Sequence, residues 1–241
     1  MRILLLAALC SLQLAGAVSF DNFKDGGYSG AGVHTTTIVA SGTNIGCIVV
    51  TWYRSGSTGT PTCGGNSMTR ISTMATTVCS GAATVDTWAY FGPGLAAGTL
   101  TVSITATVES ILEALTVNGA NQTGQPDAIA PYVSGMTGNN GFGLPITTVA
   151  NNALVIGTFC AGSASHAPTS NGTWISDDGN VGLRFWRSTT TVSPPGSFTL
   201  QAIGTAAGYT VEGNGLSISS LLQAPVNNTY ISNPSVIVVG P

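Results

Sequence analysis

The run Thr99-Leu100-Thr101-Val102-Ser103-Ile104 places an apolar residue at every second position. Successive side chains of an extended strand point to opposite faces, so this alternation predicts a strand with one buried face and one face in water. Two other runs, Ile45 to Val50 and Ala153 to Thr158, are continuously apolar and predict strands covered on both faces. No stretch after Ala17 shows a helical period, so the sequence predicts an all-β protein.

Short β-branched runs alternate with Gly, Asn and Pro along the rest of the chain, which is typical of β-sandwiches and barrels. The segment Gly119 to Pro145 is rich in Gly and is expected to be a loop between two groups of strands. The expected strands are Val33–Ala40, Gly46–Arg54, Ser67–Ser72, Val85–Phe91, Gly98–Thr105, Ile111–Asn118, Ile146–Val149, Ala153–Cys160, Gly182–Ser188, Ser197–Ile203 and Leu216–Leu222.

The chain also contains a faint internal repeat. Residues 43–51 resemble residues 151–159, and residues 98–104 resemble residues 196–202. An aromatic strand precedes the second of these matches in each half, and an apolar strand closes each half. Because Greek keys combine in pairs into a jelly roll, we expect a single jelly-roll-like β-sandwich over residues 18–224, built from two pseudo-repeated Greek-key halves.

The two ends of the chain differ from the rest. Residues 1–17 begin with Arg2, continue as an apolar run and end in Ala15-Gly16-Ala17, the pattern of a secretory signal cleaved after Ala17. The alternative is a retained N-terminal strand or helix. Residues 225–241 are expected to be a C-terminal tail: a linker remnant or a strand donated to a neighbouring subunit, with disorder as the other interpretation.

The composition restricts the partners. Charged residues make up 6% of the 241 residues, against roughly 25% in ordinary soluble domains, and the net charge is −3. No basic surface is available for phosphates, so we expect no nucleic-acid partner. The N-terminal apolar run is shorter than the about 20 residues that span a bilayer, so we expect no membrane span. An uncharged surface rich in Thr, Ser and Asn favours association, so we expect a homo-oligomer or a larger surface assembly.

Four cysteines remain after Ala17, and they allow three pairings. Cys63 and Cys79 lie in Gly/Ser/Thr-rich segments close together in the sequence, so an exported chain is expected to join them in a disulfide. Cys47 and Cys160 lie in apolar strands and are expected to be buried free thiols.

Residues for catalysis are sparse. The two histidines, His34 and His166, are far apart and no C-x-x-C pair exists, so we expect no metal site and no cofactor. A G-x-S-x-G elbow is also absent. We therefore predict a protein that is not an enzyme. The remaining catalytic alternative is a glycoside hydrolase-like enzyme, which needs two carboxylates across a cleft. Its candidate carboxylates are Glu109 or Glu113 with Asp127 or Asp177, although a solvent-facing Glu113 is the simpler interpretation.

Aromatic residues suggest a binding alternative. Trp52, Trp88 and Trp174 lie on or near expected strands, and an exposed ring stacks on a sugar, as in carbohydrate-binding modules. Glycans are then the expected ligands. Rings covered by neighbouring loops are the structural alternative. Nearby arginines, Arg54, Arg184 and Arg187, are expected to cap these rings through cation–π contacts.

The order of several markers along the chain resembles a known group of proteins. The markers are Ala17-Val18-Ser19-Phe20-Asp21, Ser41-Gly42-Thr43-Asn44, residues 86–93, Ala97-Gly98-Thr99, Val117-Asn118-Gly119-Ala120 and Pro126-Asp127-Ala128. Over residues 18–224 they resemble uncharacterised jelly-roll or β-sandwich modules of phage virion proteins and of secreted bacterial surface proteins.

This resemblance implies a sandwich fold and an outward-facing structural or attachment role, and it assigns a function to no residue. The signal-like N-terminus favours the secreted proteins, because virion proteins need no export signal. We therefore expect a non-enzymatic structural or adhesive subunit of an extracellular or virion surface assembly, located outside the cell or, alternatively, in a virion.

Overall fold

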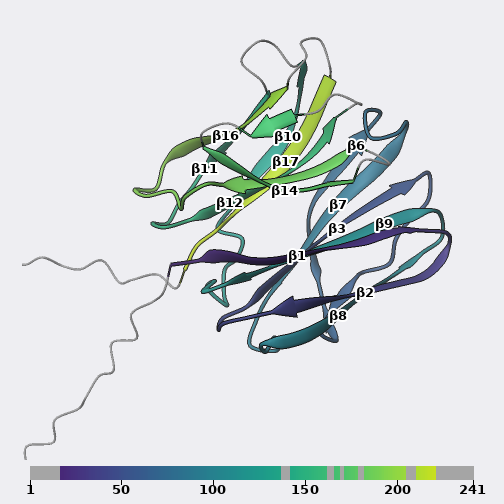
Figure 1. Ribbon diagram of the computed structural model, residues 1–241, viewed down its shortest axis with the longest axis horizontal. Helices are drawn as coiled ribbons and strands as arrows, with labels where there is room; N and C mark the ends of the chain where they lie inside the picture. Colours follow the sequence, from purple (N-terminus) through teal and green to yellow (C-terminus); the bar gives the residue numbers. More distant parts are fainter. Residues whose placement is uncertain are drawn as a thin grey trace, which may run out of the picture.

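The computed structural model describes residues 17–136, 142–161, 166–168, 171–178, 182–204 and 210–220. All regular structure in this part of the chain is β-strand, so the predicted all-β class is confirmed (Figure 1). The described ranges contain no helix long and apolar enough to cross a membrane. The expected tail at residues 225–241, and the signal-like segment except for Ala17, lie outside the described residues.

The strands form two consecutive groups. The N-terminal unit comprises β1 (Ser19–Ser29), β2 (Gly32–Ala40), β3 (Gly46–Arg54), β4 (Thr62–Cys63), β5 (Asn66–Ser67), β6 (Thr69–Thr76), β7 (Ala83–Phe91), β8 (Gly98–Ala106) and β9 (Ser110–Asn118). The C-terminal unit comprises β10 (Ala128–Met136), β11 (Phe142–Thr147), β12 (Leu154–Ala161), β13 (His166–Pro168), β14 (Gly172–Asp178), β15 (Leu183–Ser188), β16 (Ser197–Gly204) and β17 (Thr210–Ile218).

Each unit contains one larger and one smaller antiparallel sheet. The larger sheets, here called the inner sheets, have the orders β1-β9-β3-β7-β6 and β10-β17-β12-β15-β14. The smaller, outer sheets have the orders β2-β8-β4-β5 and β11-β16-β13. The two inner sheets therefore use one strand order twice. In a single jelly roll the two halves contribute strands to two common sheets, whereas here no described strand of one unit shares a sheet with the other unit.

Alternate residues of the inner strands belong to different cores. Ile48, Val50 and Trp52 of β3 lie in a central core together with Ile156 of β12 and Phe185 of β15. Residues of the opposite parity lie in a lateral core of their own unit, beneath its outer sheet. The inner sheets are thus buried on both faces and pack against each other, which explains the continuously apolar runs at residues 45–50 and 153–158.

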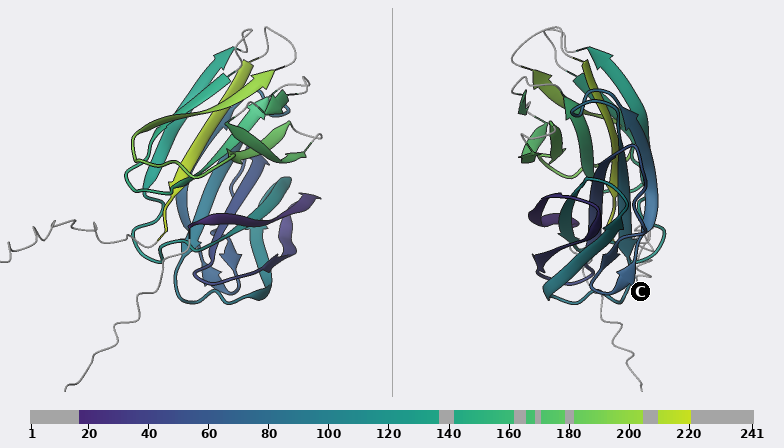
Figure 2. Two further views of the ribbon diagram at one scale, coloured as in Figure 1. Left: turned by 60° about the vertical axis from the view of Figure 1, so that its left-hand side comes forward. Right: turned by 90° about the vertical axis from the view of Figure 1, so that its right-hand side faces the viewer.

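The packing of the two inner sheets is nearly symmetric. β1 lies against β14 at one side of the central core, and β6 lies against β10 at the other. β1 and β10 occupy the same position in their two sheets, and so do β6 and β14. Each of the two contacts therefore joins the first strand of one inner sheet to the last strand of the other. A contact between two copies related by a twofold axis has the same property. Figure 2 shows the strands of the two units from two further sides.

Two long strands were not expected from the sequence. β1 and β10 are edge strands of the inner sheets, and both have irregular registers. Edge strands tolerate charges, Gly and Pro that a central strand excludes, so the apolar pattern is weak there. The loop expected at residues 119–145 is therefore wrong for β10 and for the start of β11. In β1, a Cβ at Gly26 would collide with the carbonyl oxygen of Leu112.

Candidate functional site

Two disulfides cross-link the molecule, and neither is the predicted one. Cys47 of β3 is bonded to Cys63 of β4, with 6.7 Å between their Cα atoms. Cys79, after β6, is bonded to Cys160 of β12, with 5.1 Å between their Cα atoms. The expected Cys63–Cys79 bridge and the free thiols at Cys47 and Cys160 are corrected accordingly. Nearness in sequence was misleading, because the sheets bring distant segments into contact.

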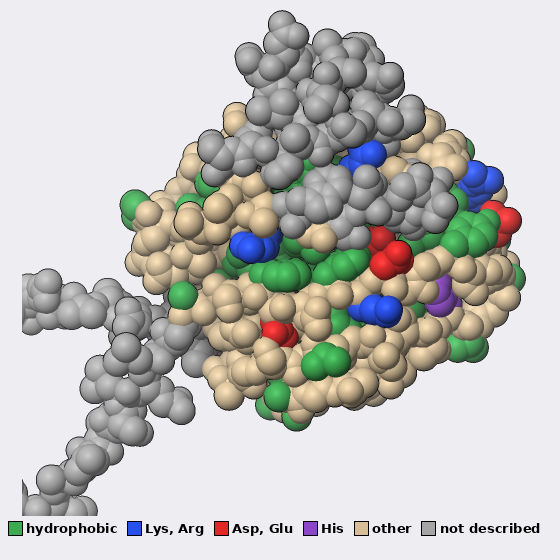
Figure 3. All heavy atoms as spheres, in the orientation of Figure 1, with side chains coloured by type: hydrophobic (Ala, Val, Ile, Leu, Met, Phe, Trp, Pro, Cys, Tyr) green, Lys and Arg blue, Asp and Glu red, His purple; other side chains and the backbone are tan. Residues whose placement is uncertain are grey.

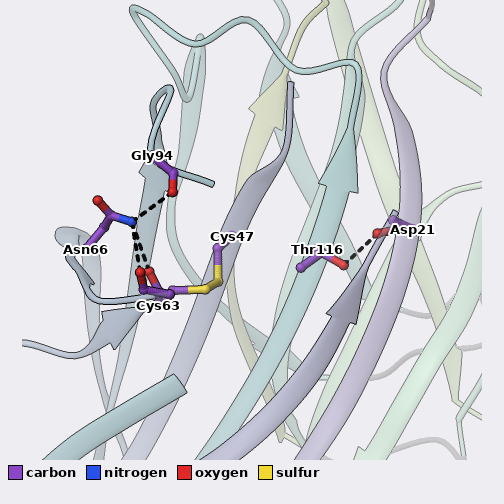
Figure 4. The surroundings of a disulfide bond; sticks show 7 residues. Asp21, Cys47, Cys63, Asn66, Gly94 and Thr116 are labelled. Atoms are coloured by element: carbon purple, nitrogen blue, oxygen red, sulfur yellow. Dashed lines mark hydrogen bonds between the residues drawn. A yellow bond between two sulfur atoms is a disulfide. The ribbon is translucent and has the colours of Figure 1, made fainter. Parts of the chain in front are cut away.

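The two bridges have different positions. Cys47–Cys63 joins the inner and outer sheets of the N-terminal unit, whereas Cys79–Cys160 lies in the central core and joins the two units. Beside the first bridge, the side-chain amide of Asn66 donates hydrogen bonds to the carbonyl oxygens of Cys63 and Gly94 (Figure 4). Disulfides of this kind are typical of oxidising compartments, which is consistent with an extracellular location.

The tryptophans predicted to bind ligands are not free surface rings. Trp52 is fully buried in the central core, and its Nε1 donates a hydrogen bond of 3.1 Å to the carbonyl oxygen of Cys79. Trp88 is 6% exposed, and its Nε1 donates to Thr51 Oγ1 at 3.2 Å. The expectation that these two rings stack on a sugar is therefore wrong. Trp174 lies in β14, and its side chain is outside the described part of the structure.

Arginines do cap aromatic rings. The guanidinium of Arg54 lies 5.6 Å from the centre of the Trp52 ring, as expected. Arg187 lies 5.4 Å from the ring of Phe20 on β1, and this contact crosses between the units. Arg70, which was not singled out in the sequence, covers Trp88 at 5.6 Å.

One open cleft combines a cation and a carboxylate, and an aromatic ring lies beside it. Its volume is about 440 Å³, and its lining residues come from the β1–β2 turn, the end of β3 and the β8–β9 turn. These residues are Ala31, Arg54, Ser55, Val108 and Glu109. Tyr28, at the end of β1, is 51% exposed and its ring lies 6.5 Å from that of Trp52. Ser29 pairs with Ser110 across β1 and β9, so Tyr28 and Glu109 are neighbours, and hydrogen bonding with this carboxylate raises the pKa of Tyr28.

A second cluster of charged residues surrounds Asp86, whose carboxylate is buried and not open to solvent. The carboxylate of Asp86 on β7 is buried and accepts hydrogen bonds from Thr73 Oγ1 at 2.6 Å and from Tyr53 Oη at 3.0 Å. Arg70 lies 3.7 Å from the same carboxylate. Burial and then the charge of Asp86 raise the pKa of Tyr53. These contacts satisfy the buried charge and therefore have a structural role.

Two of the carboxylates proposed for hydrolysis, Glu109 and Asp127, are too far apart to form a pair. Glu109 precedes β9, whereas Asp127 follows the loop after the other end of that strand. Nine extended residues separate these ends by about 30 Å, far more than the spacing of a glycosidase pair. Glu113 is 1% exposed on β9, so the prediction that it faces solvent is wrong. The side chain of Asp177 lies outside the described residues, and the described residues hold no cluster of three metal-ligating groups.

The exposed face of the first outer sheet is uncharged and repetitive. The buried side of β8 holds Leu100, Val102 and Ile104, which confirms the alternation predicted there. The other side, here called the threonine face, consists of cross-strand pairs between β2 and β8. The pairs are Val33 with Thr105, Thr35 with Ser103, Thr37 with Thr101, and Val39 with Thr99.

Within the threonine face, the hydroxyls of Thr35 and Ser103 are 3.2 Å apart. Val33 is 70% exposed and Val39 is 55% exposed. Figure 3 shows, from one side, that charged side chains are widely scattered over the surface. The alternating sequence of β8 already contained the signal for this face, but its pairing with β2 required the structure.

Comparison with protein-family models, curated proteins and solved structures found no match to this chain.

Proposed function

We propose that the chain is a non-enzymatic structural or adhesive module of an extracellular surface assembly, and that it associates with copies of itself through the threonine face. The observation that carries this proposal is the exposed array of paired hydroxyl and valine side chains on β2 and β8. An exposed β-sheet face without charge lacks the usual protection against association.

The chemistry of the threonine face favours a second copy as its partner. A hydroxyl both donates and accepts hydrogen bonds, so an array of hydroxyls is complementary to an identical array. The exposed valines add apolar area that is removed from water on contact. Charged faces repel their own copies, whereas all eight paired residues of this face are uncharged.

The rest of the architecture supports a structural role. The central core joins both units over a large apolar interface, and Cys79–Cys160 links them covalently. At the other outer sheet, the exposed pairs Thr147 with Ser197 and Pro145 with Thr199 are again uncharged. A block with uncharged faces on two outer sheets suits repeated contacts between copies. A virion assembly remains the alternative setting for the same role.

Sedimentation velocity over a wide range of protein concentration tests this proposal. We expect the wild-type protein to form larger species as its concentration rises. The double variant Thr35→Lys/Thr99→Lys places two charges on the threonine face without setting them directly opposite each other, and it should weaken association at least about tenfold. Thr190→Lys adds a charge at an exposed position next to β15 and should behave as wild type.

Wild-type protein that stays monomeric at every concentration would contradict the proposal. So would equal association of the double variant, provided that circular dichroism shows the same fold.

A further inference from the structure

We propose that the cleft beside Tyr28 binds a neutral saccharide, with the Tyr28 ring as the stacking surface and Arg54 and Glu109 as the polar contacts. This binding goes beyond the self-association proposed above, because it uses a different surface and a different class of ligand. It requires no chemical step.

The stacking surface is held in place before a ligand arrives. The Tyr28 ring packs at a tilt of 42° near the ring of Trp52, and Trp52 is itself fixed by full burial and by its hydrogen bond to Cys79. About half of the Tyr28 side chain remains exposed. A ring that is already ordered loses little conformational entropy when a ligand covers it.

Arg54 is also ordered. Its Nη2 donates hydrogen bonds to the carbonyl oxygen of Ser80 at 2.9 Å and to Ser80 Oγ at 3.0 Å. Its guanidinium also lies over the Trp52 ring. Both of these hydrogen bonds use Nη2, so a ligand in the cleft can accept hydrogen bonds from the other guanidinium nitrogens.

Glu109 supplies the opposite chemistry. Its side chain is exposed, it neighbours Tyr28 across β1 and β9, and a carboxylate accepts several hydrogen bonds at once. Arg54 and Glu109 line the same cleft, but their charged atoms are not within the 4.0 Å of an ion pair. Among the described residues, the pair at that distance is Arg70 with Asp86.

This combination favours a neutral ligand with many hydroxyls. An anion is repelled by Glu109 and a cation by Arg54, whereas a sugar hydroxyl donates to the carboxylate and accepts from the guanidinium. The C–H face of a sugar ring packs on an aromatic ring and on the apolar side chains of Ala31 and Val108. The cleft volume of about 440 Å³ lies in the range of small-molecule sites.

The C-terminal unit offers a matched control. Tyr132 on β10 is 45% exposed, and its hydroxyl donates a hydrogen bond of 2.8 Å to Glu212. The two tyrosines therefore share an edge strand of an inner sheet, partial exposure and a glutamate neighbour. Glu212, however, is 7% exposed, whereas Glu109 faces water. Loss of the Tyr132 ring tests whether any exposed tyrosine of this kind binds sugar.

Saturation-transfer NMR on the full chain provides the test. The probes are the neutral disaccharides maltose, cellobiose, lactose and N,N′-diacetylchitobiose, each at concentrations up to about 10 mM. We expect at least one of them to bind. Tyr28→Ala should weaken that binding by about tenfold or more, and Glu109→Gln should weaken it by about fivefold. Tyr132→Ala should leave the affinity unchanged.

Several outcomes would overturn the inference. One is the absence of binding by all four disaccharides, and another is an equal loss in the Tyr28→Ala and Tyr132→Ala variants. Binding of charged saccharides or free amino acids in place of the neutral probes would also overturn it. The Thr35→Lys/Thr99→Lys variant should bind sugar as wild type does, so failure of sugar binding and failure of self-association are observed separately.

Discussion

The two units share one strand order in their inner sheets but differ in what they present to solvent. In the N-terminal unit, the tyrosine at the end of β1 lies beside an open cleft with Arg54 and Glu109. In the C-terminal unit, Tyr132 in the middle of β10 donates to a buried glutamate. Strands that are apolar on both faces determine the architecture that the units share, whereas a few residues at strand ends determine whether an open cleft forms.

The units also differ in how they are cross-linked. Cys47–Cys63 closes a segment within the N-terminal unit, with a sequence separation of 16. Cys79–Cys160 connects the two units, with a separation of 81. A cross-link restricts the unfolded chain more strongly when it closes a longer loop, so the second bridge is expected to contribute more to stability.

Removal of the bridge between the units should have the largest effect. The double variant Cys79→Ala/Cys160→Ala should lower the free energy of unfolding by about 4.5 kcal/mol, because it releases the longer loop. The matched variant Cys47→Ala/Cys63→Ala should lower it by about 3 kcal/mol. Guanidinium denaturation followed by fluorescence measures both values. A larger loss from the shorter loop would reverse the assigned roles of the two bridges.

Packing between the units should have the next largest effect. Phe185 contacts Phe23 of the other unit with 5.8 Å between ring centres, whereas Phe159 contacts Trp186 of its own unit at 5.2 Å. Phe185→Leu and Phe159→Leu should each destabilise the protein by about 1–2 kcal/mol. Of the two variants, only Phe185→Leu should separate unfolding by denaturant into two transitions, because only Phe185 packs between the units. If Phe159→Leu also splits it, the central core does not couple the units.

The pH dependence of stability tests the segment that joins the units. Burial raises the pKa of Asp127, which immediately precedes β10, above its ordinary value of 3.8. A raised pKa in the folded state means that this group favours folding below pH 3.8, and that its contribution is lost as the pH rises through the folded-state pKa.

Asp127→Asn should therefore raise the melting temperature at neutral pH, and its advantage should disappear as the pH falls below about 3.8. Melting curves from pH 3 to pH 8 measure this difference. A variant that is less stable than wild type at pH 7 would show that the carboxylate is stabilised, not penalised, in the fold.

The smallest effect concerns the phenol in the cleft. The hydrogen bond to Glu109 raises the pKa of Tyr28 above 10.0. Glu109→Gln should lower this pKa toward its ordinary value, because an amide stabilises the neutral phenol less than a carboxylate does. The pKa of Tyr28 is measured by alkaline titration, from the difference in ultraviolet absorbance between wild type and variant. Asp25→Asn, on the same strand, is the control and should leave the Tyr28 titration unchanged.

Strands with a clear apolar pattern, either continuous as in β3 or alternating as in β8, could be predicted from the sequence. β3 was predicted with the observed bounds, because its residues are apolar on both faces and the chain around them is rich in Gly and Ser. β1 and β10 were missed, because edge strands have only one paired neighbour and tolerate the residues that normally end a strand.

The candidate site was less predictable. Glu109 was singled out as a possible catalytic carboxylate, but its neighbours Tyr28 and Arg54 come from strands that only the topology brings together. Trp52 was expected to be a binding ring and is instead buried, with its ring 6.5 Å from that of Tyr28. The disulfides were mispaired for the same reason, since contacts between β3 and β4, and between the units, leave no trace in sequence spacing.

A non-reducing peptide map of the full chain, read by mass spectrometry, tests most directly the claim that the two units pack through their inner sheets. We expect cross-linked peptides that contain Cys47 with Cys63 and Cys79 with Cys160. A peptide that joins Cys63 to Cys79, or a free thiol at Cys160, would contradict it, because the inner sheets would then lack the bridge across their shared core.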